Sequence, residues 1–157
     1  MKKLQQIFLT FFYSGLLPKA PGTYGTLLGA VFGLLLLKNI PLSTFTLLTV
    51  ALTLFSIKVI DKEERESGIH DSSYIVIDEV VGIWIAFIIS SSSVVQIVLS
   101  VIFFRIYDIW KPSIIGKIDR DVKGGWGVMG DDIIAGIFAG LSSSIVYGAL
   151  IKMGILL

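Results

Sequence analysis

Long apolar runs separated by short polar segments dominate the chain. The apolar runs are Leu27–Leu37, Leu42–Ile60, Ile75–Ile89, Val94–Ile109 and Ile133–Ile151. Most are somewhat shorter than the roughly 20 residues that a helix needs to cross a bilayer, so we expect tilting or local thinning. The more amphipathic stretch Leu4–Leu17 comes first and predicts a helix lying in the membrane interface. The pattern predicts an all-α, polytopic membrane helical bundle with about five spanning helices plus a short N-terminal interfacial helix.

The composition supports a membrane protein with one domain. The 157 residues are 54% hydrophobic and 16% charged, and the mean hydropathy is +0.86, which is far above the range of soluble proteins. We expect residues 1–157 to form a single membrane-embedded domain. The absence of cysteine excludes disulfides and thiol chemistry. The net charge of +1 gives no reason to expect a nucleic-acid partner.

The basic residues predict the orientation of the bundle. With the N-terminus inside, residues 1–26, 58–79 and 105–132 share one side and hold eleven of the thirteen basic residues. The short linkers 38–41 and 90–93 then lie on the opposite side. This asymmetry is what the positive-inside rule requires, so we expect the three polar segments to face the cytoplasm. Their convergence predicts a single site.

The first polar segment, residues 18–26, combines two prolines and two glycines with Lys19. We expect a loop before a helix, with Thr23 or Thr26 capping that helix. Free backbone N–H groups and Lys19 would suit a phosphate. An ordinary capped helix entry is the alternative interpretation.

Two pairs of adjacent carboxylates mark the other polar segments. Asp78 and Glu79 open one apolar run, and Asp131 and Asp132 precede another after a glycine-rich stretch, residues 124–130, that predicts a tightly turned loop. A favourable helix dipole or an N-cap are the simpler explanations. Four carboxylates together instead predict a site for a hard divalent cation such as Mg²⁺.

Basic residues accompany these acids. Arg105, Asp108 and Lys111 recur at spacing three, which is compatible with a plain salt-bridge stripe on a helix. Arg105 and Lys111 would also bind phosphate oxygens. Carboxylates for metal and cations for phosphate at a membrane face indicate phosphoryl chemistry on a lipid headgroup.

Small residues at spacing four indicate close helix packing. They are Gly25, Gly29 and Gly33 in one run, and Gly136, Gly140, Ser144 and Gly148 in another. Packing within the chain is the favoured interpretation, and a homodimer is the alternative.

Four motifs together resemble one known family. They are Pro18-Lys19-Ala20-Pro21-Gly22-Thr23 with Gly25, Ile77-Asp78-Glu79-Val80-Val81-Gly82, residues 104–112 (FRIYDIWKP) and residues 124–132 (GGWGVMGDD). In this order and spacing they resemble the phosphatidylglycerophosphatase A family. Tyr107 and Tyr24 stand where phenylalanine and tryptophan are expected.

The resemblance implies a multi-pass, Mg²⁺-dependent lipid phosphatase of the bacterial inner membrane, which converts phosphatidylglycerophosphate to phosphatidylglycerol. The acidic positions that it carries over are Asp78, Glu79, Asp108, Asp131 and Asp132, with Lys111 as a basic partner. Taken with the residue patterns, we predict metal ligands at Asp78, Glu79, Asp131 and Asp132. We predict phosphate binding by Lys19, Thr23, Arg105 and Lys111, and catalytic roles for Asp108, Asp131, Asp132 and Lys111.

Several alternatives stay open at this point. Water attack with Asp108 or Asp71 as base competes with an aspartyl-phosphate intermediate, and His70 is a candidate proton relay. Another lipid or polyprenyl phosphate phosphatase is the nearest functional alternative. A divalent-cation transporter would need its acids near the bilayer midplane, and a structural membrane subunit would need no metal.

Overall fold

The computed structural model describes residues 2–90 and 93–156, and within these it is all-helical with no strand. Its elements are α1 (Lys3–Leu9), the 3₁₀ helix η1 (Ser14–Leu16), α2 (Pro21–Asn39), α3 (Leu42–Ser67), α4 (Ile77–Ser90), α5 (Val94–Trp110), α6 (Ile114–Asp121) and α7 (Gly125–Lys152). The predicted all-α class is confirmed. Part of the predicted 90–93 linker, residues 91 and 92, lies outside the described residues.

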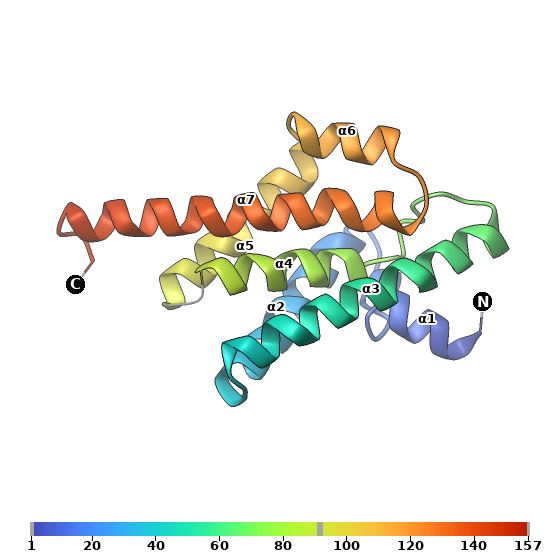
Figure 1. The fold of residues 1–157 in the computed structure, drawn as a ribbon, viewed down its shortest axis with the longest axis horizontal. Helices are drawn as coiled ribbons and strands as arrows, with labels where there is room; N and C mark the ends of the chain where they lie inside the picture. Colours follow the sequence, from blue (N-terminus) through green and yellow to red (C-terminus); the bar gives the residue numbers. More distant parts are fainter. Residues whose placement is uncertain (1, 91–92, 157) are drawn as a thin grey trace.

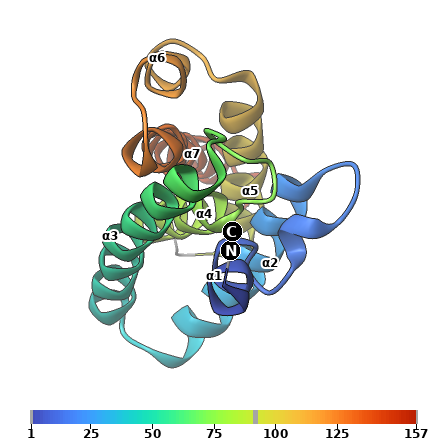
Figure 2. The ribbon, with the colours of Figure 1, turned by 90° about the vertical axis from the view of Figure 1, so that its right-hand side faces the viewer.

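Helix α4 lies at the centre of the bundle. Figures 1 and 2 show it surrounded by α2, α3, α5 and α7. Ten of its fourteen residues are buried, which fits a sequence that is apolar on every side. The first turn of this central helix carries Asp78 and Glu79. These acids therefore lie in the interior of the bundle, at the N-terminal end of α4.

Glycines allow α2 to pack closely on the chain around α4. A Cβ at Gly25 would lie 2.6 Å from the Val76 side chain, and one at Gly29 would lie 3.0 Å from Val80. The indole Nε1 of Trp84 donates a hydrogen bond of 2.8 Å to the Gly29 carbonyl. On α7, Gly136 meets the Gly82 carbonyl in the same way. These small residues therefore serve packing within the chain.

Within residues 2–90 and 93–156, three helices, α2, α3 and α7, are long and apolar enough to cross a membrane. Leu27, Val31 and Leu35 are each about half exposed along α2, on a face that suits contact with lipid. Helices α4 and α5 have 14 and 17 residues, or about 21 and 26 Å at 1.5 Å per residue, which is less than a hydrocarbon core of about 30 Å. The predicted count of about five spans is not confirmed.

The N-terminal region is less regular than predicted. The stretch Leu4–Leu17 is not one helix, because α1 ends at Leu9 and η1 follows after a turn. Helix α2 begins at Pro21, a residue that suits a first helical position. Thr23 and Thr26 thus lie inside the helix and neither caps it, so the predicted cap is wrong.

Helix α7 begins at Gly125, so the glycine-rich stretch predicted as a loop is mainly helical. Only Gly124 within it has a positive φ, of 75°. The other glycines permit close approach: a Cβ at Gly125 would lie 2.3 Å from the Ile57 carbonyl oxygen, and one at Gly127 would lie 2.1 Å from that of Val122. Asp131 and Asp132 consequently lie in the second turn of α7, and neither is an N-cap.

Candidate active site

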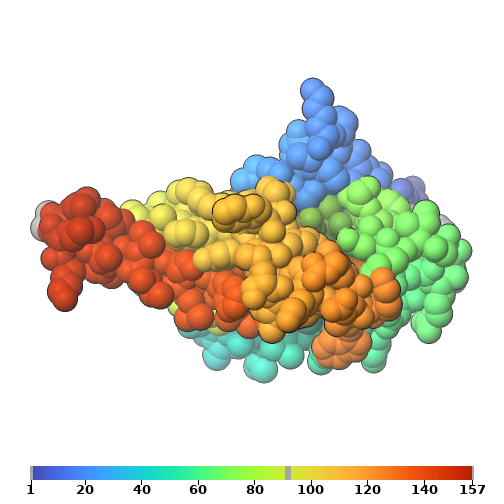
Figure 3. All heavy atoms as spheres, turned by 90° about the horizontal axis from the view of Figure 1, so that it is seen from above, coloured from blue at the N-terminus to red at the C-terminus, as the bar shows by residue number. Residues whose placement is uncertain are grey.

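A polar pocket of about 500 Å³ opens where the three polar segments meet. Its walls come from the start of α2, the loop before α4, the first turn of α4, the end of α5 and the second turn of α7. Figure 3 views the face on which α6 lies. The segment before α2 (blue), the loop after α3 (green) and the end of α5 (gold) are visible on the same face. The predicted convergence of the three segments is therefore observed.

Three carboxylates form a cluster in this pocket. One oxygen each from Asp78, Glu79 and Asp132 lie within 4.8 Å of one another. Asp78 and Asp132 are buried, and Glu79 is partly buried. Two of the buried oxygens, Glu79 Oε2 and Asp132 Oδ1, have no hydrogen-bond partner among the described residues. Buried unpaired carboxylate oxygens are costly, and carboxylate oxygen is the type of ligand that Mg²⁺ prefers.

The overall charge of the pocket strengthens this interpretation. Six carboxylates and three cationic side chains line it, which leaves an excess of three negative charges when all are ionised. Such a surface repels a phosphate. A divalent cation at the cluster would remove most of this repulsion, so the residues present fit such an ion.

Arg105 is held in place by groups from two helices. Its Nη1 pairs with Asp108 on the same helix and lies 3.3 Å from Thr26 Oγ1, while Nη2 donates to Thr23 Oγ1 at 3.2 Å. The Nε atom is buried without a partner among the described residues. Thr23, predicted to bind phosphate, thus contacts the guanidinium in this structure.

Lys111 connects three elements. Helix α5 ends before it, and its φ of 43° places it in the left-handed region. Its Nζ lies 2.6 Å from Asp131 Oδ2 and also pairs with Asp119 on α6. Burial disfavours the charged form, but the bonds to Asp119 and Asp131 outweigh it and raise the pKa of Lys111 above its ordinary value. Lys111 therefore stays protonated at neutral pH.

The pairing with Lys111 separates Asp131 from the other predicted metal ligands. Asp131 lines the pocket, yet the carboxylate cluster consists of Asp78, Glu79 and Asp132. Adjacent helical residues point in directions about 100° apart, so Asp131 and Asp132 contact different neighbours. Both were predicted from the sequence as metal ligands. In the structure Asp132 belongs to the carboxylate cluster, whereas Asp131 pairs with Lys111.

Lys19 lies at the mouth of the pocket with a free ammonium group. It is exposed, it lines the pocket, and its φ of 75° is unusual for a residue with a side chain. No hydrogen bond or ion pair occupies its Nζ among the described residues. Of the three predicted phosphate-binding cations, Lys19 is thus the one whose side chain has no hydrogen-bond or ion-pair partner among the described residues.

Asp71 also reaches the pocket, from the loop between α3 and α4. Glu64 Oε1 holds this loop: it accepts a 3.2 Å hydrogen bond from the Asp71 backbone N–H and lies 2.6 Å from His70 Nδ1. Neighbouring protein displaces part of the water around the Asp71 carboxyl and raises its pKa above the ordinary value, while Lys111 opposes this rise. His70, the candidate proton relay, is tied to Glu64 and does not line the pocket.

Three supporting residues were not predicted from the sequence. Asp119 pairs with Lys111, Glu64 anchors the loop of Asp71, and Asp61 Oδ1 accepts a 2.6 Å hydrogen bond from the Gly125 N–H at the start of α7. Asp61 and Glu64 lie in the charged segment after the apolar run Leu42–Ile60, and this segment continues α3 as far as Ser67. Their place in that charged run was the available signal.

Comparisons with known proteins agree on one family. The family described as phosphatidylglycerophosphatase A matches residues 7–147. A relative of that name from Haemophilus influenzae is 37% identical over 129 residues, which cover 82% of this chain and 79% of the relative. A relative of the same name from Escherichia coli is 35% identical over 137 residues, covering 87% and 77%.

A relative with a different name also matches. A putative phosphatidylinositol-3-phosphatase from Bacteroides thetaiotaomicron is 36% identical over 137 residues, covering 83% of this chain and 85% of its own. No solved structure matches the chain significantly.

Proposed function

The chain belongs to the phosphatidylglycerophosphatase A family, and we propose that it hydrolyses the terminal phosphomonoester of phosphatidylglycerophosphate to give phosphatidylglycerol. The observation that supports this most is the carboxylate cluster with two unpaired oxygens in a pocket that three cationic side chains also line. That combination is suited to a phosphorylated anionic substrate and a divalent cation.

Asp78, Glu79 and Asp132 are the residues that would hold Mg²⁺. An ion bound there would polarise a phosphate oxygen and assist the activation of water. Asp131 belongs to the site through Lys111, whose Nζ it helps to position.

The cations would bind the phosphate in stages. Lys19 is free at the mouth and meets an incoming phosphate first. Lys111 uses two of its three ammonium protons for Asp119 and Asp131, so one donor is left for a phosphoryl oxygen. Arg105 has an unpaired Nε–H, and its guanidinium charge stabilises negative charge that develops during phosphoryl transfer.

Asp71 is the better candidate of the two predicted bases. Asp108 is paired with Arg105, whereas the carboxylate of Asp71 has no hydrogen-bond partner among the described residues. A carboxylate with a raised pKa is also a stronger base. In hydrolysis by water, Asp71 takes a proton from the attacking water as the oxygen of that water bonds to phosphorus. The bond from phosphorus to the glycerol oxygen breaks, and the glycerol oxygen takes up a proton from solvent and leaves as the alcohol. An aspartyl-phosphate route stays open, and rapid acid quench with labelled substrate would trap it if it occurs.

We place the site at the cytoplasmic face of a bacterial inner membrane. In Figure 1 the start of α7 and the end of α3 lie at one end of the molecule, and the C-terminal end of α7 lies at the other. The site lies at that first end, together with most of the basic residues. A transporter would need its acids near the middle of the spans, so this location disfavours that alternative. A homodimer stays a prediction with no contact to support it.

The test is phosphate release by the purified full-length protein in detergent. We expect release from phosphatidylglycerophosphate that requires Mg²⁺ and falls by at least 100-fold in Asp132→Asn and Glu79→Gln. Asp121→Asn, the same change at an exposed position of α6, should retain activity. Phosphatidylinositol 3-phosphate and a polyprenyl phosphate serve as competing substrates. Faster release from either would replace the proposed substrate, and metal-independent release would refute the proposed site.

A further inference from the structure

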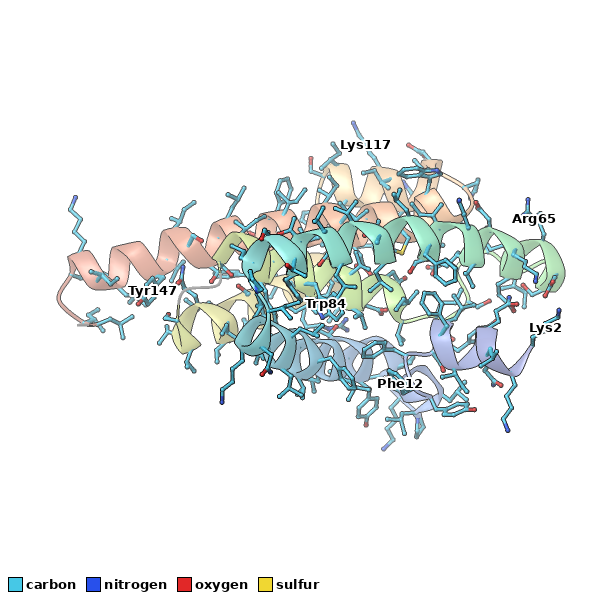
Figure 4. All side chains as sticks on the ribbon, turned by 60° about the horizontal axis from the view of Figure 1, so that its bottom comes forward. Lys2, Phe12, Arg65, Trp84, Lys117 and Tyr147 are labelled. Atoms are coloured by element: carbon cyan, nitrogen blue, oxygen red, sulfur yellow. The ribbon has the colours of Figure 1, made fainter. Side chains whose placement is uncertain are left out.

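A second large groove lies away from the candidate active site, between α1 and α3. Its volume is about 520 Å³, and it is lined by Lys2, Lys3, Leu4, Gln5, Phe8, Phe55, Val59 and Lys62. None of these residues lines the polar pocket. Figure 4 shows α1 beside α3, with Lys2 and Arg65, which lies in the last turn of α3, at the same end of the molecule.

The floor of the groove is apolar and open. Phe8 of α1 and Phe55 of α3 meet edge to face with ring centroids 5.0 Å apart. Phe55 is nevertheless 56% exposed, and Leu4 is 81% exposed. Val59 continues the same surface one turn further along α3. An acyl chain would cover this surface and gain contacts that the protein itself leaves unmade.

The rim of the groove carries three lysines, of which only Lys62 has an acidic partner among the described residues. Lys2 and Lys3 have no side-chain partner among the described residues, and no acidic residue lines the groove. Lys62 is 3.7 Å from Glu66, but both side chains are about half exposed, so this pair neutralises little.

The nearest buried acid on this side is already satisfied. Glu63 is 4% exposed and accepts hydrogen bonds of 2.6 Å from Gln5 Nε2 and from the Tyr74 hydroxyl. Its carboxylate therefore faces the interior, where it joins α1 to α3, and it does not offset the lysines at the rim. The hydrogen bond between Gln5 and Glu63 thus connects the two helices that form the groove, while the ammonium groups of Lys2 and Lys3 stay free.

We infer that the groove between α1 and α3 is an accessory site for an anionic membrane phospholipid, with an acyl chain on the aromatic floor and the headgroup phosphodiester at Lys2, Lys3 and Lys62. The apolar floor distinguishes a lipid from free phosphate, which would gain nothing from it. The uncompensated lysines distinguish an anionic from a zwitterionic headgroup. This site does not depend on the proposed reaction.

The test is lipid binding by the full-length protein in a neutral detergent, measured by native mass spectrometry. Phosphatidylserine is the probe, because it is an anionic phosphodiester and hence not the proposed phosphomonoester substrate, and phosphatidylcholine is the zwitterionic comparison. Each lysine near an anionic lipid surface contributes about fivefold in affinity. We expect Lys2→Gln/Lys3→Gln to bind phosphatidylserine about 25-fold more weakly, with phosphatidylcholine binding unchanged.

The matched control is Lys117→Gln/Lys123→Gln, which removes the same charge from exposed positions near α6 and should bind like the wild type. A loss of equal size in the control would show diffuse attraction and overturn the site. Equal binding of both lipids by the wild type would overturn it as well. Phe55→Ser should weaken both lipids, and an unchanged affinity would refute the role of the floor.

Discussion

Replacing Asp132 with asparagine should stabilise the metal-free protein while removing its response to Mg²⁺. Asp132 is 3% exposed. One of its carboxylate oxygens lies within 4.8 Å of an oxygen of Asp78 and of an oxygen of Glu79. Two charges at that distance repel by about 3 kcal/mol at an effective dielectric constant of 20. Side-chain relaxation limits the gain, so we expect about 1–2 kcal/mol, or a rise of about 2–8 °C in the apparent melting temperature.

The assay is thermal unfolding in detergent, with chelator or with saturating Mg²⁺. An ion at 100 times its dissociation constant stabilises a protein by about 2.7 kcal/mol, so the wild type should melt higher with Mg²⁺ and Asp132→Asn should not. Asp121→Asn removes the same charge from an exposed position and should behave like the wild type. An unchanged or lower melting temperature of Asp132→Asn in chelator, or a preserved Mg²⁺ shift, would refute the reasoning.

Three further predictions follow from single contacts. Lys111→Met should lower the free energy of unfolding by about 3 kcal/mol, because it leaves two carboxylates without their cation. Chemical denaturation should show this loss and its recovery in Lys111→Arg, and an unchanged free energy of unfolding in Lys111→Met would contradict the pairing. Gly22→Ala would place a Cβ 2.3 Å from Glu79 Oε1 and should abolish phosphate release, whereas Gly148→Ala, with open space, should have no effect; similar activity of the two would argue against this geometry. Because partial burial raises the pKa of Asp71 above 3.8, its contribution to stability is full below pH 3.8 and is lost as the pH rises through the raised value. Free energies of unfolding measured from pH 3.5 to 7 should fall for this reason in the wild type and not in Asp71→Asn. Identical pH profiles of the two proteins would count against a raised pKa of Asp71.

The chemistry of the site was readable from the sequence because charge is rare in this chain. Asp78, Glu79 and Asp132 stand out against apolar neighbours, and the positive-inside pattern places their segments on one side. The structure does bring these three acids together. Burial of acids near hydrocarbon is so unfavourable that its occurrence is informative without any knowledge of the fold.

The start of α7 could not be predicted in the same way. A glycine-rich stretch is typical of a turn, and only long-range packing shows that Gly125 lies against the Ile57 carbonyl. Asp61 also supplies the hydrogen bond that begins this helix, from 64 residues earlier in the chain. Local sequence carries neither of these contacts.

Helix α6 and its Asp119 were missed for a related reason. The helix has only eight residues, of which four are charged, and this is too short a window for the hydrophobic pattern to give a signal. Asp119 gains its importance only through Lys111, which the chain places beside it by ending α5 in the left-handed region. The role of Asp119 therefore could not be predicted before the position of Lys111 was known.

The distribution of cations explains why the site would depend on a metal ion. Arg105 is paired with Asp108, and Lys111 with Asp119 and Asp131, so the protein's own charges neutralise acids that lie outside the cluster. Asp78, Glu79 and Asp132 form no ion pair with a basic side chain among the described residues. A protein arranged for stability alone would place a lysine or arginine among them, since burial of unpaired charge is destabilising. The observed arrangement leaves two of their oxygens unpaired among the described residues, which suits the proposed ion. For this reason the same substitution should raise stability in chelator and abolish the response to Mg²⁺.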